Sequence, residues 1–213
     1  MTDPQAPTPR EAFELVLAGN QRFVSGSPEH PNQDAARRAE TAPSQQPFAV
    51  LFGCSDSRLA AEIIFDRGLG DLFVVRTAGH VVGAEVLGSV EFGVSVLDAP
   101  LVVVLGHDSC GAIAAACSVL EDGRAPGGFL RDVVERVTPS VLAARAAGRE
   151  SADEILAEHI EHTVDLLLER SHVLAERVAA GRVAVVGLSY RLADGSARLV
   201  ASRGLDEADP LAS

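Results

Sequence analysis

Short apolar runs alternate with longer amphipathic stretches from Pro47 onward. Three stretches, 59–68, 83–99 and 110–123, have the apolar spacing of helices. Strands separated by helices favour parallel βαβ units, so the pattern predicts an α/β fold with a mostly parallel central sheet flanked by helices. The four expected strands of that sheet are FAVLFG (48–53), DLFVVR (71–76), PLVVVLGH (100–107) and RVAVVGLSYRL (182–192).

The C-terminal part of the chain is expected to add two helices and a hairpin. The helices are predicted at about 128–147 and 152–180. Asp194-Gly195 is a turn signal between the fourth apolar run and SARLVAS (196–202), which predicts an antiparallel edge strand. The third run, 100–107, is rich in Val and Leu and suits the centre of the sheet.

The N-terminal part has a different character. Thr8 and Glu11 form a capping-box pattern with Pro9 at the first helical position, which predicts a helix to about Val24. The first nine residues, with three prolines, are expected to be a loose tail, and residues 25–46 a wrapping arm with at most a short helical turn. We therefore divide a chain that forms a single domain overall into residues 1–46 (tail, helix and arm) and residues 47–213 (the α/β part).

Composition limits the partners that the chain can have. Its 213 residues, 47% of them hydrophobic, suffice for one sizeable core. The net charge is −12 and every basic residue is Arg, so the surface should repel nucleic acid and anionic lipid. No apolar run approaches the roughly 20 residues that span a membrane. The N-terminus lacks the pattern of a secretory signal, and a cytoplasmic protein is expected.

Candidate metal ligands follow the first and third apolar runs. Cys54 comes directly after the first run, and His107 and Cys110 lie at the end of the third. The carboxyl ends of neighbouring parallel strands meet in one crevice, where these side chains can converge. Two cysteines and one histidine are typical zinc ligands, and a catalytic zinc site keeps a fourth position open. The sequence predicts one Zn²⁺ per chain at this crevice.

Asp56 and Arg58 lie beside the first predicted ligand. Asp56 could be a fourth zinc ligand. Alternatively, a bidentate salt bridge to Arg58 would hold Asp56 off the metal, where its carboxylate could accept a hydrogen bond from a bound hydroxide. Both roles stay open from the residues alone.

Other residues with reactive side chains have simpler explanations. Cys117 lies two helical turns after Cys110 and is expected to be a core thiol. His159 and His162 have a metal-compatible spacing, but their acidic neighbours indicate a solvated helix face. His80 follows a strand end, and a structural role is expected for it.

At these residues the sequence resembles the β-class carbonic anhydrases of bacteria. CSDSR, GDLFVVRTAG and GHDSCGA occur in the family's order and separation, and the resemblance covers roughly residues 10–200. It implies zinc-dependent reversible hydration of carbon dioxide to bicarbonate and a proton, a lyase reaction in which zinc hydroxide attacks the carbon. It also implies a homodimer or a dimer of dimers, in which the N-terminal helix and arm embrace a second subunit.

The resemblance assigns roles to individual residues. It places zinc ligands at Cys54, His107 and Cys110, and at Asp56 the position that alternates between binding zinc and pairing with an arginine, here Arg58. Gly111 matches a position whose backbone amide lies near the bound substrate.

The resemblance also bears on bicarbonate control. Some members hold a noncatalytic bicarbonate on a Trp, an Arg and a Tyr. Arg76 and Tyr190 match two of these positions, but the third is Leu51, which argues against that control here.

Two other functions remain compatible with these motifs. Some relatives hydrolyse carbon disulfide or carbonyl sulfide at the same kind of zinc site. A catalytically silent zinc protein is the other alternative, although a structural site would not need both Asp56 and Arg58.

Overall fold

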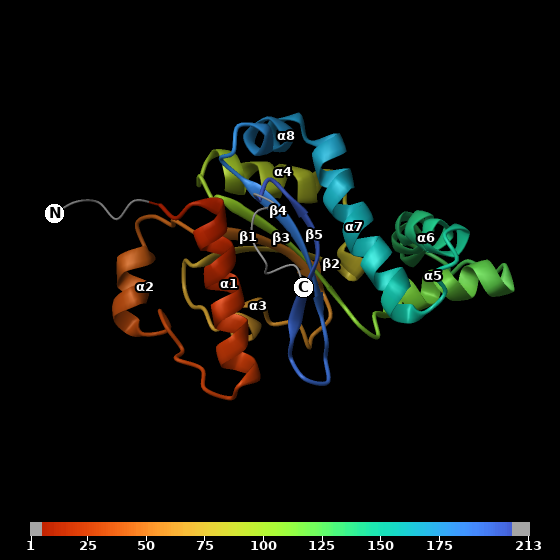
Figure 1. Cartoon of the computed structure of the whole chain (residues 1–213), viewed down its shortest axis with the longest axis horizontal. Coiled ribbons are helices and arrows are strands. Elements are labelled where there is room, and N and C mark those ends of the chain that lie inside the picture. The colour runs from red at the N-terminus through yellow and green to blue at the C-terminus, as the bar shows by residue number, and fades with distance from the viewer. Residues whose placement is uncertain (1–5, 206–213) are drawn as a thin grey trace.

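The computed structural model describes residues 6–205, which fold around one five-stranded sheet (Figure 1). The strand order is β2-β1-β3-β4-β5, and all neighbours are parallel except β4 and β5. The predicted α/β class, the four parallel strands and the antiparallel edge strand are confirmed. The strands are β1 (Ala49–Cys54), β2 (Leu72–Thr77), β3 (Leu101–His107), β4 (Ala184–Tyr190) and β5 (Ala197–Arg203).

The central position of β3 follows from its composition. All seven of its residues are buried, and it pairs with β1 on one side and β4 on the other. The registers place Gly53 of β1 beside Leu105, and Tyr190 of β4 beside His107. The carboxyl ends of β1 and β3 therefore lie at the same edge of the sheet, as the sequence predicted.

Helices cover both faces of this sheet. In Figure 1, α1 and α3 lie on one side of the strands, α4, α7 and α8 lie on the other, and α5 and α6 project beyond the sheet. Among the described residues, no helix is both long enough and apolar enough to cross a membrane. The helices are α1 (Pro9–Val24), α2 (Ala35–Thr41), α3 (Ala61–Ile64), α4 (Ala84–Ser95), α5 (Gly111–Asp122), α6 (Leu130–Ala146), α7 (Ala152–Arg170) and α8 (His172–Ala179), with a 3₁₀ turn η1 (Ala78–His80).

The N-terminal segment has the predicted local structure. The reciprocal capping box between Thr8 and Glu11 is present, α1 ends at Val24, and α2 is the short helical turn expected within the arm. Residues 1–5 of the expected tail lie outside the described residues.

Two predicted helices are shorter than expected. The helix at 59–68 is reduced to the four residues of α3, because Asp66 adopts a left-handed conformation (φ 45°) that stops it. The helix at 152–180 is broken at Ser171, which leaves helical geometry and accepts a hydrogen bond from the Leu174 N–H as the N-cap of α8. At Ser171 the interruption is local, because the side chain bonds to backbone three residues away. At Asp66 the backbone partners are Glu29 and His30, which lie far away in the sequence.

Asp66 explains how the arm is fixed to the rest of the chain. Its buried carboxylate accepts hydrogen bonds from the backbone N–H groups of Glu29 (3.0 Å) and His30 (2.9 Å) and from Arg22 Nε (2.5 Å). Burial opposes ionisation of this carboxylate, but the three donors outweigh it and lower the pKa of Asp66 to about 2. A negative charge at this position therefore stabilises the folded arm.

Replacing Asp66 with asparagine should lower the free energy of unfolding by about 3 kcal/mol at pH 7, because Arg22 and two N–H groups lose a buried anionic acceptor. The folded pKa lies below the unfolded value of about 3.9, so the contribution is complete above about pH 4 and is lost as the pH falls towards 2. Urea unfolding at pH 7 and pH 3 should show that the difference in free energy of unfolding between variant and wild type is smaller at pH 3.

The matched control, Asp98→Asn, removes an exposed carboxylate paired with Arg177 and should change the free energy of unfolding by less than about 0.5 kcal/mol. A difference that is the same at both pH values would contradict this account.

Candidate metal centre and active site

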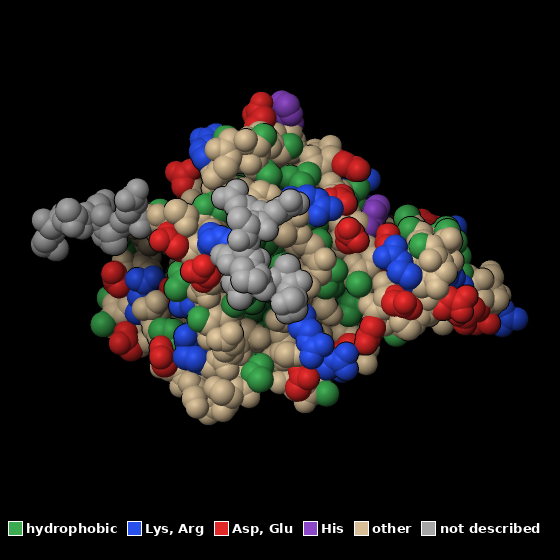
Figure 2. All heavy atoms as spheres, in the orientation of Figure 1, with side chains coloured by type: hydrophobic (Ala, Val, Ile, Leu, Met, Phe, Trp, Pro, Cys, Tyr) green, Lys and Arg blue, Asp and Glu red, His purple; other side chains and the backbone are tan. Residues whose placement is uncertain are grey.

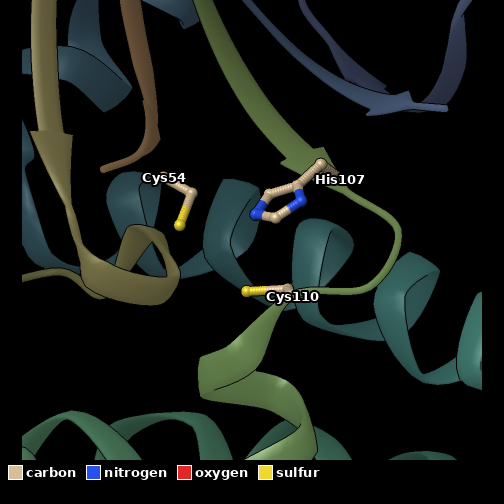
Figure 3. Close-up of side chains that lie close together, drawn as sticks. All are labelled: Cys54, His107 and Cys110. Atoms are coloured by element: carbon tan, nitrogen blue, oxygen red, sulfur yellow. The ribbon is translucent and has the colours of Figure 1, made fainter. Parts of the chain in front are cut away.

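The three predicted zinc ligands come together at the carboxyl edge of the sheet. Cys54 is the last residue of β1, His107 is the last residue of β3, and Cys110 is the N-cap of α5. All three are buried, and their ligand atoms lie within 4.8 Å of one another. Figure 3 shows the two sulfurs and one ring nitrogen of His107 pointing toward a common centre.

The ring of His107 is oriented for a ligand. Its Nδ1 lies 2.8 Å from the backbone carbonyl of Asp108. A carbonyl can only accept, so Nδ1 carries the proton and Nε2 of the neutral ring has a free lone pair. Nε2 is buried and has no hydrogen-bond partner among the described residues. A bound metal ion would satisfy this orphaned atom, and the donor set of two sulfurs and one imidazole nitrogen fits zinc.

The two neighbouring cysteines affect each other's ionisation. The Cys110 thiol beside Cys54 lowers the pKa of Cys54, and Cys54 in turn raises the pKa of Cys110. The backbone N–H of Gly79 also donates to Cys54 Sγ, at 3.3 Å. Because zinc binds thiolates, a cation between the two sulfurs would favour loss of the remaining thiol proton.

Asp56 is paired with Arg58 beside this group. Arg58 Nε and Nη2 donate to Oδ1 and Oδ2 of Asp56 at 2.9 and 2.6 Å, and the Arg58 backbone N–H donates to Oδ1 at 2.9 Å. The guanidinium holds the pKa of Asp56 well below its usual range. Asp56 Oδ2 lies 3.9 Å from His107 Nε2, close to the three ligands but turned toward Arg58. Of the two roles open from the sequence, this structure has the one in which Arg58 holds the carboxylate.

Arg76 stabilises the loop that carries Cys54 and Asp56. Its Nε donates to the Cys54 carbonyl at 2.9 Å, and its Nη2 donates to the Asp56 carbonyl at 2.6 Å. This contact could not be predicted from the sequence, because Arg76 lies on β2, 20 residues or more from both acceptors. The parallel register of β1 and β2 brings them together, with Gly53 opposite Arg76.

Gly111 is the first residue of α5, directly after the predicted ligand Cys110. A Cβ built on Gly111 would meet no atom within 4 Å, so its backbone faces open space. A cavity of about 350 Å³ adjoins the same loop on the side of α5 and α7, lined among others by His107, Cys110 and Ile113. There is room beside the predicted ligands His107 and Cys110 for a small molecule.

Three residues outside this group also have defined places. Cys117 is half-buried: it packs against the core and also lines the 350 Å³ cavity, so it is less enclosed than the predicted core thiol. His80 is fully buried, and its expected structural role stays a prediction. The prediction of a solvated face is wrong for His159, which is 2% exposed, because α7 packs this face against α6 and the 3₁₀ turn.

Comparison with known proteins decides the family. A family model described as carbonic anhydrase matches residues 49–197. The chain belongs to the carbonic anhydrase family. Carbonic anhydrase 2 of Mycobacterium tuberculosis is 56% identical over 191 residues, which cover 90% of this chain and 92% of that protein. Carbonic anhydrase of Mycolicibacterium smegmatis is also 56% identical, over 90% of this chain and 93% of that protein.

Solved structures of β-carbonic anhydrases share the fold. CafA of Aspergillus fumigatus superposes with a TM-score of 0.68 at 26% identity, over 93% of this chain and 92% of that one. A tetrameric β-carbonic anhydrase of Sordaria macrospora gives a TM-score of 0.70 at 22% identity, over 90% of this chain and 98% of that one. The resemblance inferred from the sequence is confirmed. This carbonic anhydrase is a zinc-dependent lyase for the hydration of carbon dioxide, and it has a Cys-His-Cys group placed to bind the metal.

Proposed function

We propose that Cys54, His107 and Cys110 are the three protein ligands of a catalytic zinc ion whose fourth position is open. The buried and unpartnered Nε2 of His107, directed at two sulfurs, is the observation that carries this proposal. Zinc would supply Lewis acidity, which makes water a nucleophile near neutral pH. The two thiolates would neutralise the charge of the cation within a buried site.

Asp56 and Arg58 would act as a catalytic pair beside the metal position. The carboxylate of Asp56 stays ionised and can only accept hydrogen bonds, so it can orient the water that attacks carbon dioxide. Arg58 would hold Asp56 in this position and keep it from becoming a fourth ligand. The 3.9 Å from Asp56 Oδ2 to His107 Nε2 supports a carboxylate that reaches the reacting atoms without joining the ligand set.

Gly111 would contribute its backbone amide to substrate binding. The N–H groups of the first helical turn have no partners within the helix, so they favour a polar or anionic ligand such as bicarbonate. The open space beside Gly111 lets a triatomic substrate approach. A side chain at this position would occupy that space.

Removal and replacement of the metal test this function. Protein treated with a strong chelator and then desalted should lose carbon dioxide hydration, measured by stopped flow, and one equivalent of Zn²⁺ per chain should restore it. Parallel assays with carbonyl sulfide and carbon disulfide distinguish the alternative substrates. Zinc-loaded protein that hydrates no carbon dioxide but hydrolyses a sulfur substrate would contradict the proposal, and so would activity that survives without metal.

We also propose that the protein is a homodimer or a dimer of dimers, in which residues 1–46 embrace a second subunit bound to the α/β part. No residue of α2 is buried within one chain. Large apolar side chains are exposed near the β2 edge and the arm, among them Ile63 (60%), Leu69 (45%) and Phe92 (43%). Sedimentation equilibrium at micromolar concentration checks the assembly, and a single 22.2 kDa species would contradict it.

We propose a cytoplasmic location and small-molecule partners. Cys54 and Cys110 must stay reduced to bind metal, which a reducing compartment ensures. Acidic and arginine side chains are interspersed on the face shown in Figure 2, and the net charge is −12. This supports carbon dioxide and bicarbonate as the partners rather than nucleic acid or a membrane. Fractionation of cells would contradict the location if the protein were recovered outside the cytoplasm.

A further inference from the structure

A buried histidine lies directly behind the metal centre. His159, on α7, is 2% exposed, and its two ring nitrogens contact two different elements. Nε2 lies 2.9 Å from the carbonyl of Gly79 in the 3₁₀ turn, and Nδ1 lies 2.9 Å from Oγ of Ser140 on α6. Ser140 is itself fully buried. These contacts connect α6, α7 and the turn that follows β2.

The contacts fix the direction of the hydrogen bonds. Burial lowers the pKa of His159 to about 4, so the ring is neutral at physiological pH. The Gly79 carbonyl can only accept, which requires the single ring proton to be on Nε2. Nδ1 must then accept from the Ser140 hydroxyl. The hydrogen bonds therefore run from Ser140 to His159 and from His159 to Gly79.

Gly79 connects this histidine to a metal ligand. Its backbone N–H donates to Cys54 Sγ at 3.3 Å, while its carbonyl accepts from His159. Gly79 has a left-handed conformation (φ 62°), and a Cβ here would lie 2.6 Å from the Cβ of Ala112. Only the two dihedral angles of this one residue separate the N–H from the carbonyl. A side chain that holds the carbonyl therefore also restrains the direction of the N–H.

The neighbouring His80 packs against the same ring. The two imidazole centroids are 4.4 Å apart, and His80 is completely buried. Neither ring nitrogen of His80 has a hydrogen-bond partner among the described residues, so this ring contributes packing rather than hydrogen bonds. The tilted ring contact on one side and the hydrogen bonds at both nitrogens hold His159 in one orientation.

We propose that His159 is a positioning residue of the metal centre, which fixes the Gly79 peptide so that its N–H donates to the Cys54 thiolate. This inference rests on the proposed role of Cys54 as a zinc ligand. Hydrogen bonds to a ligating atom orient it and tune its donation to the metal, and their loss typically weakens metal binding by about 10- to 100-fold. His159 would therefore affect zinc affinity and the electronic state of the metal–sulfur bond without touching the metal.

Three variants of the full-length protein test this role. His159→Leu keeps an apolar side chain of similar reach but removes the donor to Gly79. His159→Gln restores a donor, because its amide nitrogen can occupy the place of Nε2. His162→Leu is the matched control: His162 lies on the same helix and lines the same cavity of about 360 Å³ as His159, but it has no contact with Gly79 among the hydrogen bonds of the described residues.

Two readouts need no catalytic activity: the zinc dissociation constant from competition with a chelator, and the near-ultraviolet thiolate-to-metal band of the Co²⁺-substituted protein. We expect His159→Leu to raise the dissociation constant about 10- to 100-fold and to shift the band. His159→Gln should recover most of both effects, and His162→Leu should match the wild type. Ser140→Ala should shift the band in the same direction by a smaller amount, and it gives the answer if the leucine variant does not fold.

A leucine variant with wild-type affinity and an unshifted band would overturn the proposal. Equal losses in the leucine and glutamine variants would also overturn it, because packing rather than the hydrogen bond would then be responsible. Failure of the proposed function is a separate result, visible in the wild type alone: either no thiolate-to-Co²⁺ band, or zinc bound at these sulfurs with no hydration of carbon dioxide.

Discussion

Replacing Cys54 with alanine is expected to remove the zinc and to reduce carbon dioxide hydration by more than about 1000-fold, because nothing else in the site lowers the pKa of water from about 15.7 toward 7. Cys54 provides one of two thiolates and is the acceptor of the Gly79 N–H. Its loss leaves only His107 and Cys110, too few ligands for a stable zinc site. Zinc content by atomic absorption and hydration by stopped flow measure the two effects.

Cys117→Ala is the matched control for this prediction. Cys117 is also a free cysteine and lies two helical turns after Cys110, half-buried in α5. This variant should keep one zinc per chain and the wild-type rate. A Cys54→Ala protein that still binds zinc and hydrates carbon dioxide would contradict the assignment of the metal centre. A wild type without activity, together with a Cys54→Ala variant that is only less stable, would instead indicate a silent zinc protein.

Replacing Arg58 with alanine is expected to lower kcat/KM by about 100-fold while zinc stays bound, a loss of the size that a positioned polar or acid–base group contributes. Without the bidentate guanidinium, Asp56 is free to turn toward the metal position, since its Oδ2 already lies 3.9 Å from His107 Nε2. The loop itself should persist, because Arg76 still holds its carbonyls. Stopped-flow kinetics together with zinc content separate these effects.

The double variant Asp56→Ala/Arg58→Ala tests whether Arg58 acts through Asp56. If Arg58 acts by holding Asp56, the double variant should be no slower than Asp56→Ala alone, since the two residues act as a unit. Arg131→Ala, which removes an exposed arginine paired with Glu135 on α6, is the control and should leave kinetics unchanged. Losses from the two single changes that multiply in the double variant would contradict a shared role.

The centre of the sheet was predictable from the sequence because β1, β3 and nearly all of β4 are buried. Such strands appear as continuous apolar runs, and the fully buried β3 is the clearest case. The helix ends were harder to predict. Asp66 stops α3 because its carboxylate binds backbone N–H groups of the arm 36 and 37 residues away, and no local pattern encodes such a partner.

The cluster of Cys54, His107 and Cys110 could also be predicted from the sequence, since these residues end or follow strands whose carboxyl ends must meet. The residues that support it were not. Arg76 and Gly79 reach the Cys54 loop through backbone atoms, which leave no side-chain motif. His159 lies among acidic residues that indicate a solvated face, and only the packing of α7 against α6 makes it a buried one. Contacts made by backbone groups, or across distant helices, need the folded structure to be found.

X-ray absorption at the zinc edge of the purified wild-type protein tests the central claim most directly. We predict two sulfur scatterers at about 2.3 Å and lighter nitrogen or oxygen scatterers at about 2.0–2.1 Å, the distances typical of zinc–thiolate and zinc–imidazole bonds. A zinc ion with no sulfur ligand, or with more than two, would contradict the site formed by Cys54, His107 and Cys110.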